Sequence, residues 1–240
     1  MPAEFQDLIA NPKKTENTLE TLNLNKVSVV FCPMELTEDQ LKLVLPARDL
    51  FKRIGIRSVS MDDIARELGM SKKTLYQYVE NKEQLVHLVM AQQTCDDLDV
   101  LAVHRDEARD AIDELLRNSR YFIRLMRSIS PTAMHDLQKY YPDIFHSRVK
   151  DHQKVLVQRV KDNLERGIRE GIYREDIDAE VIAQLYVGMT ALVMDRSVFP
   201  AHERPLSEIL RQYTTYHFNG IVNEAGFERI KTYLAQEDLS

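Results

Sequence analysis

Long stretches of this 240-residue chain contain no proline, and glycine is rare throughout. Proline is absent from residues 47–130 and from residues 143–199, and the whole chain has only 7 glycines. The same stretches are rich in Leu, Glu, Arg, Lys and Gln, which favour helix. Alternating runs of β-branched residues, which would indicate strands, are nearly missing. The sequence therefore predicts an all-α fold.

The remaining prolines and glycines divide the chain into helices. Thr37 and Gln40 form a capping-box pattern that begins the first helix, and Gly55 ends it. Pro46 lies inside this helix and removes one backbone hydrogen bond, so we expect a kink there. Farther along, the same punctuation predicts helices at about 82–104, 107–129, 132–140, 143–170, 178–198, 205–223 and 227–236.

Three segments differ in character. Residues 1–34 are polar and have no sustained hydrophobic period, so we expect a poorly ordered extension. Met34 stands directly before the first helix, which suggests that it is the natural start; an intact-mass measurement of the native protein would test this. Residues 35–81 have the pattern of short helices joined by tight turns, and residues 82–240 have that of long amphipathic helices.

Charge is distributed unevenly between these segments. The net charge is −6, which argues against a protein that binds nucleic acid over its whole surface. Residues 35–82, however, carry 9 Lys or Arg and 8 Asp or Glu, whereas residues 83–240 carry 20 and 26. The stretch Ser71–Val79 contains two lysines and no acidic residue. A local surface that faces phosphates is therefore compatible with the acidic chain.

The segment Val59–Leu85 has the pattern of a helix-turn-helix. Ser60 is the N-cap of one short helix, Gly69 makes a turn, and Ser71 is the N-cap of the next helix. In that second helix Leu75 faces inward, and several polar residues face outward. A helix that reads DNA needs an N-terminal turn free of acidic residues and outward side chains that donate hydrogen bonds.

The outward residues of the second helix meet this requirement. Lys72, Lys73 and Tyr76 lie at spacings of one, three and four and so share a surface, which Thr74 and Gln77 flank. Lysines donate to guanine edges or phosphates, and the hydroxyl of Tyr76, like that of Tyr78, suits phosphates. The plainer interpretation is an ordinary helical cap with solvated lysines.

This segment resembles the DNA-binding domain of the TetR family of bacterial transcriptional regulators. The resemblance is close over about residues 38–88 and looser beyond them, while Pro46 departs from the small helix-forming residue usual in the family. It implies base or groove contacts from Lys72, Lys73 and Thr74, and phosphate contacts from other residues of the motif. The features that carry it are Leu50-Phe51, Gly55, Ser60, Ile64-Ala65, Leu68-Gly69, Ser71, Thr74-Leu75-Tyr76, Tyr78 and Asn81-Lys82-Glu83, and the implied phosphate contacts are Ser60, Tyr76, Tyr78 and Lys82.

The resemblance also implies the arrangement of the rest of the chain. Residues 35–81 would form the helix-turn-helix DNA-binding domain, and residues 82–240 a helical domain that binds an effector and dimerises. Wide apolar stripes on the last long helices support the dimer, with candidate interface residues Tyr186, Leu192, Leu206, Leu210 and Tyr213. Adaptable or aromatic residues that could line an effector pocket, or simply fill the core, are Tyr121, Phe122, Met126, Met134 and Met189.

Other classes of function find little support. The 7 histidines have no metal-ligand spacing, no glycine-rich phosphate loop is present, and no catalytic constellation stands out, so we expect no enzyme, metal or cofactor. No apolar run is long enough to span a bilayer, and no secretory leader pattern opens the chain, so we expect a cytoplasmic protein that needs no membrane.

The predicted function is a homodimeric, ligand-responsive transcriptional regulator, a repressor that a small effector releases from a palindromic double-stranded DNA operator. The alternative is a helical protein–protein interaction or adaptor module whose helix-turn-helix does not bind DNA. Steep salt dependence of DNA binding would distinguish the first from the second. The sequence identifies neither the effector nor the operator.

Overall fold

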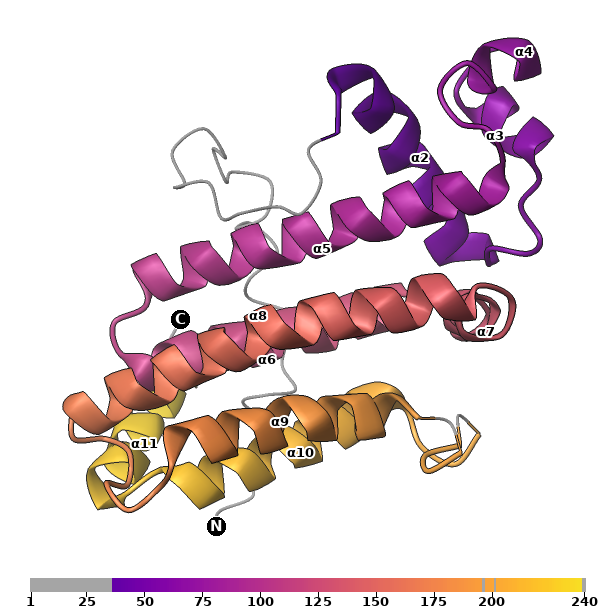
Figure 1. Ribbon diagram of the computed structural model, residues 1–240. Coiled ribbons are helices and arrows are strands. Elements are labelled where there is room, and N and C mark those ends of the chain that lie inside the picture. Colours follow the sequence, from indigo (N-terminus) through magenta and orange to yellow (C-terminus); the bar gives the residue numbers. More distant parts are fainter. Residues whose placement is uncertain (1–35, 196, 201, 239–240) are drawn as a thin grey trace. The chain divides into compact units, whose positions relative to one another are not determined.

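The structure, a computed structural model, describes residues 36–238 except residues 196 and 201. The extension expected at residues 1–34 lies outside the described residues. Within the described part every regular element is a helix (Figure 1), and one isolated antiparallel bridge joins Tyr173 to Val222. The all-α prediction is therefore confirmed. The helices are α2 (Glu38–Ile54), α3 (Met61–Glu67), α4 (Lys72–Leu75), α5 (Lys82–Glu107), α6 (Ala111–Ser128), α7 (Pro131–Tyr140), α8 (Pro142–Arg169), α9 (Ala179–Met194), α10 (Leu206–Ile221) and α11 (Glu224–Asp238).

Helix α2 begins and ends where the sequence predicts. Thr37 and Gln40 form a complete capping box, and the backbone N–H of Gly55 donates to Phe51 at the other end. Pro46 lies inside a helix that continues on both sides of it. A proline in a helix interior removes one backbone hydrogen bond and destabilises the helix by about 3 kcal/mol. The side chains of Val44 and Ala47, close to Pro46, are completely buried, and their burial acts in the opposite direction.

The described chain forms two compact units. The smaller unit contains residues 36–100 and 128–152, and the larger unit contains residues 101–127 and 153–238. Helices α5 and α8 are continuous, and each contributes residues to both units. None of the described helices combines the length and apolar composition required to cross a bilayer.

The smaller unit has a core to which α2, α3, α4 and the start of α5 contribute. Ile64, Leu75 and Leu85 are completely buried in it. Helix α7 packs against α2, where Gly55 adopts φ +101° and a side chain would clash with Thr132. The buried carboxylate of Asp136 on α7 accepts a hydrogen bond of 2.7 Å from the backbone N–H of Arg57. Helix α7 therefore positions the loop of residues 55–60, which connects α2 to α3.

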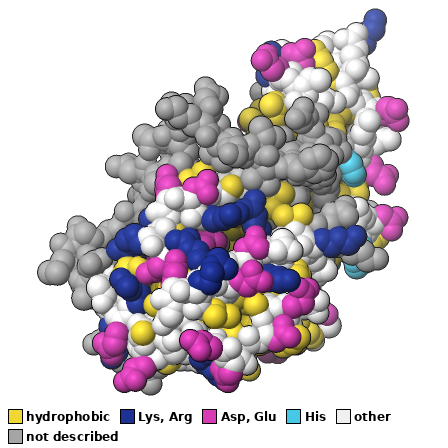
Figure 2. Space-filling model, turned by 60° about the vertical axis from the view of Figure 1, so that its left-hand side comes forward, with side chains coloured by type: hydrophobic (Ala, Val, Ile, Leu, Met, Phe, Trp, Pro, Cys, Tyr) yellow, Lys and Arg dark blue, Asp and Glu magenta, His cyan; other side chains and the backbone are white. Residues whose placement is uncertain are grey.

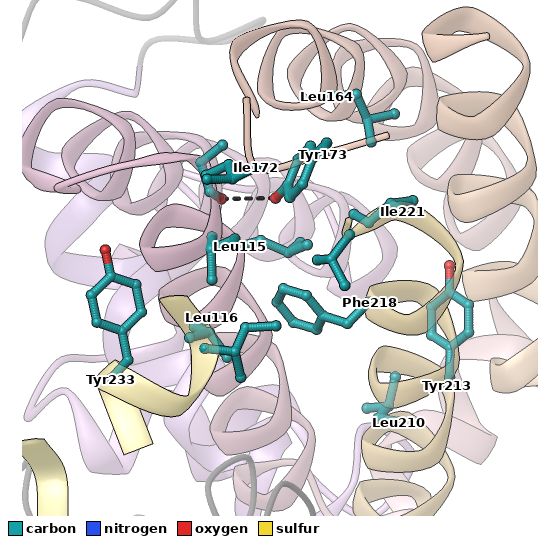
Figure 3. Packing of buried hydrophobic residues seen from close by; sticks show 14 of the residues in the cluster. Leu115, Leu116, Leu164, Ile172, Tyr173, Leu210, Tyr213, Phe218, Ile221 and Tyr233 are labelled. Atoms are coloured by element: carbon teal, nitrogen blue, oxygen red, sulfur yellow. Dashed lines mark hydrogen bonds between the residues drawn. The ribbon is translucent and has the colours of Figure 1, made fainter. Parts of the chain in front are cut away.

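The larger unit is built around Tyr173, which is completely buried among aliphatic side chains (Figure 3). Its hydroxyl donates to the carbonyl of Ala111, 3.1 Å away, and also lies 3.2 Å from Asn163 Oδ1. Asn163 Nδ2 donates to the same carbonyl at 3.0 Å. Gly167 lies against the tyrosine ring, where any Cβ would be 2.1 Å from a ring carbon. The close approach of α8 to this ring therefore requires glycine.

Ion pairs join α6 to the end of α8 in the larger unit. Arg166 contacts Glu114 at 3.2 Å and Glu170 at 2.7 Å. Burial raises the pKa of Glu114 above its ordinary value, although Arg166 opposes the shift. Burial also tends to raise the pKa of Asp113, but hydrogen bonds from Arg109 lower it overall.

Figure 2 shows that basic and acidic side chains alternate on one face of the molecule, so that this face does not carry charge of a single sign.

Candidate nucleic-acid interface and ligand cavity

The helix-turn-helix is held together by local hydrogen bonds. The N–H of Asp63 donates to Ser60 Oγ at 3.1 Å, and the N–H of Ser60 donates back to Asp63 Oδ2 at 2.9 Å. Helix α3 ends in a Schellman motif, in which the N–H of Met70 donates to Ala65 and that of Gly69 donates to Arg66. Gly69 has φ +63°, a left-handed conformation that glycine adopts without strain. Gly69 thus makes the turn between α3 and α4 possible.

Helix α4 is short and presents polar side chains to solvent. Ser71 caps it by accepting a 3.1 Å hydrogen bond from the N–H of Thr74, and Leu75 anchors it in the core. After Leu75 the chain continues in a tighter turn, with the N–H of Gln77 bonded to Thr74 and that of Tyr78 bonded to Leu75. The structure therefore brings the sequence-predicted residues of the second helix onto one helical turn and its continuation.

The two lysines of α4 have different surroundings. Lys72 Nζ lies 3.0 Å from Asp62 of α3, and this hydrogen-bonded pair raises the pKa of Lys72. Lys73 is exposed and has no ion pair within the part of the chain that the structure describes. Tyr76, Gln77 and Tyr78 are also exposed. The surface thus offers one unpaired ammonium group, with hydroxyl and amide donors beside it.

Three other predicted residues are already engaged within the protein. The hydroxyl of Thr74 lies 2.8 Å from Ser71 Oγ, and that of Ser60 bonds Asp63 at 2.6 Å. Lys82 is half-buried, and Nζ donates to the carbonyl of Arg57 at 3.3 Å. Burial lowers the pKa of Lys82, although nearby carboxylates oppose the shift. A phosphate contact from Lys82 would have to replace or share its bond to Arg57.

The larger unit contains a cavity that opens to solvent. Residues from α6, α8, α9 and α10 line it, together with Leu101 near the end of α5. The lining combines aliphatic and aromatic side chains with Asn118, Ser119, Thr190 and His217, and the cationic side chain that lines it is Arg159. The cavity is thus mainly apolar, with a few polar groups, which is typical of small-molecule sites.

The sequence-predicted pocket residues lie in different places. Phe122 lines the cavity, and Tyr121 is buried next to it, edge-on to the Phe122 ring. Met126 and Met189 pack against the core of the larger unit. Met134 lies on α7 in the smaller unit. The cavity therefore draws on residues that the sequence does not assign to a pocket, above all on α10.

His217 of α10 is one of these residues. Its side chain is only 8% exposed, and its Nε2 atom has no hydrogen-bond partner among the residues that the structure describes. Its ring lies 4.2 Å from that of Tyr186, centroid to centroid. Burial lowers the pKa of His217 to about 4, so the imidazole is neutral near pH 7. A histidine four residues after Tyr213 in an amphipathic helix is the only sequence signal, and a core position would give the same signal.

The predicted dimer residues also separate into groups. Leu210 and Tyr213 are buried in the core of the larger unit and line the cavity. Tyr186 stacks on Tyr213 with the ring centroids 5.0 Å apart, and burial raises the pKa of Tyr186 to about 12. Leu206 is half-buried against the same core, and Leu192 is 49% exposed. Of the five, Leu192 is thus the most available to a partner.

An apolar stripe runs along the exposed side of α9. Val181 and Leu185 are 49% and 55% exposed, and with Gly188 and Leu192 they recur at intervals of four, three and four residues, which places them on one helical face. No atom of the described residues lies within 4 Å of where a Cβ of Gly188 would be. On the neighbouring helix α10, Tyr216 is 69% exposed. Exposed side chains of this size on adjacent helices indicate a contact surface.

Comparison with known proteins gives consistent results. Residues 45–89 match the family model described as "Bacterial regulatory proteins, tetR family". The transcriptional regulator YvaF of Bacillus subtilis is 24% identical over 177 residues, covering 72% of this chain and 90% of YvaF. The transcriptional repressor KstR2 of Mycolicibacterium smegmatis is 24% identical over 198 residues, covering 77% of this chain and 91% of KstR2.

Solved structures share the fold. A transcriptional regulator from Cytophaga hutchinsonii has a TM-score of 0.64 and 19% identity, covering 78% of this chain and 100% of that one. A TetR-family regulator from Agrobacterium tumefaciens has a TM-score of 0.60 and 18% identity, covering 77% and 97%. The all-α architecture is thus one that bacterial regulators use.

Proposed function

We infer that this chain, which is a DNA-binding transcriptional regulator of the TetR family, works as a dimeric repressor that a small ligand releases from its operator. The observation that carries this proposal is the exposed donor surface of α4, which lies inside the segment that matches the family. KstR2, a relative, is named a repressor, and this favours the same sign of regulation here. A repressor of this kind works on the chromosome, in the cytoplasm.

We propose that α4 enters the major groove and that some residues of the helix-turn-helix contact bases while others contact phosphates. Lys73 is the best candidate for a base edge because it is exposed and unpaired in the described part of the chain. Lys72, Thr74 and Gln77 would contact the groove beside it. Hydroxyls and amines around the helix would bind phosphates and so fix the position of α4; the candidates are Ser60, Tyr76, Tyr78 and Lys82.

The test uses DNA selected from random sequence by the purified full-length protein. Lys73→Ala and Tyr76→Ala should each weaken binding to the selected operator by about 1–3 kcal/mol if the residue contacts a base. Lys231→Ala, which removes an exposed lysine on α11, is the matched control and should leave affinity unchanged. Wild-type affinity in both α4 variants, with helical circular dichroism intact, would contradict the assignment.

We propose that the second copy in the dimer covers the apolar stripe of α9 and Tyr216. Two such helices from each copy would form a four-helix interface, and the open space at Gly188 lets a partner helix approach closely. Leu185→Glu places a charge in the middle of the stripe and should convert a dimer to a monomer in sedimentation. Glu228→Lys, a charge change on an exposed residue of α11, should not. A monomeric wild type at micromolar concentration would count against the interface.

We propose that the cavity of the larger unit holds the effector. Helix α5 supplies Leu85 to the core of the smaller unit and Leu101 to the cavity lining, so a ligand that displaces one end of α5 also acts on the other. Release from DNA then requires that the ligand bind the DNA-free conformation more tightly than the DNA-bound one. A compound that stabilises the protein thermally should therefore also weaken operator binding.

A further inference from the structure

We propose that the ligand of the cavity is a predominantly apolar molecule that carries an uncharged oxygen, a hydroxyl or a carbonyl, which hydrogen-bonds to His217 Nε2. This inference rests on the proposed function, because it names the chemistry of the effector site. It depends on which polar atoms of the lining are already satisfied by the protein and which are not.

Most polar side chains of the lining already have protein partners. Ser119 Oγ donates to the carbonyl of Leu115 at 2.8 Å, and Thr190 Oγ1 donates to that of Tyr186 at 2.9 Å. The hydroxyl of Tyr213 bonds the Tyr186 carbonyl as well. These bonds lie within the protein and leave the hydroxyl protons occupied. These three hydroxyls therefore have no proton left for a ligand, and the guanidinium of Arg159 is the cationic donor of the lining.

His217 differs from these residues. Among the described cavity-lining side chains, it alone has a fully buried nitrogen or oxygen atom without a hydrogen-bond partner. An unpaired buried polar group is destabilising, so the free protein carries a cost that a correctly placed ligand atom removes. Since Nε2 accepts or donates according to the tautomer, both a hydroxyl and a carbonyl oxygen satisfy it.

The neutral state of His217 favours an uncharged ligand atom over an anion at this position. Burial disfavours the imidazolium form of His217, and the neighbouring ring of Tyr186 is uncharged near pH 7, as a tyrosine with an ordinary pKa also is. A carboxylate placed beside His217 Nε2 would lose its hydration and gain one hydrogen bond from a neutral group. That hydrogen bond does not offset the cost of burying the charge. Apolar walls favour an apolar body for the remainder of the ligand.

Three probes with the same ring system separate the possibilities. Naphthalene has no oxygen, 2-naphthol has an uncharged oxygen, and 2-naphthoate is an anion. Binding to the full-length protein is measured by tyrosine fluorescence quenching or calorimetry. We expect 2-naphthol to bind at least about fivefold more tightly than naphthalene, the effect of one hydrogen bond to a buried group, and more tightly than 2-naphthoate.

Variants of His217 then test whether this residue causes the preference. His217→Leu should bring the two affinities within about twofold, whereas His217→Gln, which keeps a hydrogen-bonding group near the Nε2 position, should retain the preference. His202→Leu makes the same substitution at a histidine whose side chain is 83% exposed and should behave as wild type. The glutamine variant keeps the test valid if the leucine variant does not fold.

Several outcomes would overturn the inference. Equal binding of naphthalene and 2-naphthol by the wild type would do so, and so would a preference that survives in His217→Leu. Tightest binding of 2-naphthoate, lost in Arg159→Gln, would show that the ligand is an anion held by Arg159 instead. If no probe binds, the inference fails, while DNA binding is decided separately by operator selection with the same protein.

Discussion

The helix-turn-helix region and the larger unit are both helical, but the hydrogen bonds that stabilise them span different distances along the chain. In the former, the side chains of Thr37, Ser60 and Ser71 each accept from a backbone N–H only three residues ahead. In the latter, Asn163 Nδ2 bonds a carbonyl 52 residues away, and the hydroxyl of Tyr233 reaches a carboxylate 123 residues away. The caps of the first region form between near neighbours in the chain, although Asp136 of α7 also holds the loop before α3, whereas these bonds of the larger unit exist only after the chain has folded.

This difference separates the two proposed sites, the surface of α4 and the cavity. Side chains on α4 can change without disturbing the caps that form the helix, since Lys73 and Gln77 make none of those bonds. A cavity residue such as His217 or Tyr213, in contrast, is also part of the core that supports the cavity. Substitutions should therefore affect DNA affinity alone in the first region, and stability together with ligand binding in the second.

Protonation of His217 should have the largest effect on the stability of the larger unit. The pKa of His217 falls from 6.5 in the unfolded chain to about 4 in the folded one. Its contribution to stability is thus complete above pH 6.5 and is lost as the pH falls through about 4. The loss should amount to roughly 3 kcal/mol, measured by urea unfolding at a series of pH values.

His217→Gln cannot titrate and serves as the reference, because other groups of the chain also bind protons in this range. The free energy of unfolding of the wild type should fall more steeply than that of the variant between pH 6.5 and pH 4. Parallel curves would mean that the imidazole is hydrated or paired in solution. Nε2 of His217 would then not be an unpaired buried atom.

Gly167→Ala should break the core of the larger unit at its tightest contact. The added methyl group would overlap the buried ring of Tyr173, which also holds Ala111 through its hydroxyl. We expect a loss of about 2 kcal/mol in the free energy of unfolding, measured by urea denaturation.

Gly220→Ala is the matched control for this substitution. Nothing lies within 4 Å of its Cβ position in α10, so stability should stay the same or rise by up to about 1 kcal/mol. Equal effects from the two substitutions would show that helix propensity, and not the contact with Tyr173, determines the result.

The helix-turn-helix could be predicted from the sequence because its determinants are close together in the chain. A cap, a glycine and an inward leucine within Ser60–Leu75 are sufficient to indicate α3, the turn and α4, and the structure confirms each. What the sequence did not reveal is the environment of each lysine. The ion pair between Lys72 and Asp62 joins residues ten positions apart on different helices, so no single helical period predicts it.

The cavity could not be predicted in the same way. Its lining comes from helices separated by as many as a hundred residues, and each lining residue has an unremarkable position in its own helix. Phe122 was anticipated as an aromatic residue on an amphipathic helix, a description that fits core residues equally well. The unpaired state of His217 depends on which groups surround it, and this is a property of the packed structure alone.

The two lysines of α4 differ in one contact, the ion pair of Lys72 with Asp62. Asp62→Asn removes the carboxylate that holds Lys72 and leaves both lysines free to face DNA. Because the ion pair is exposed, stability should change little. Operator affinity should increase several-fold, at most about tenfold, and log K against log salt should become steeper by up to about 0.9, the slope that one additional lysine charge in the groove contributes by releasing a counterion.

Asp39→Asn makes the same charge change in another exposed ion pair, with Lys42 on α2 at the same distance of 3.0 Å. If the effect is one of local pairing, only the α3 substitution should steepen the salt dependence. If both variants gain equally, the net charge of the protein governs its association with DNA, and Lys72 makes no specific contact. An unchanged slope in both would indicate that Lys72 already exchanges Asp62 for a phosphate when DNA binds, because the ion pair would then restrain the lysine only in the free protein.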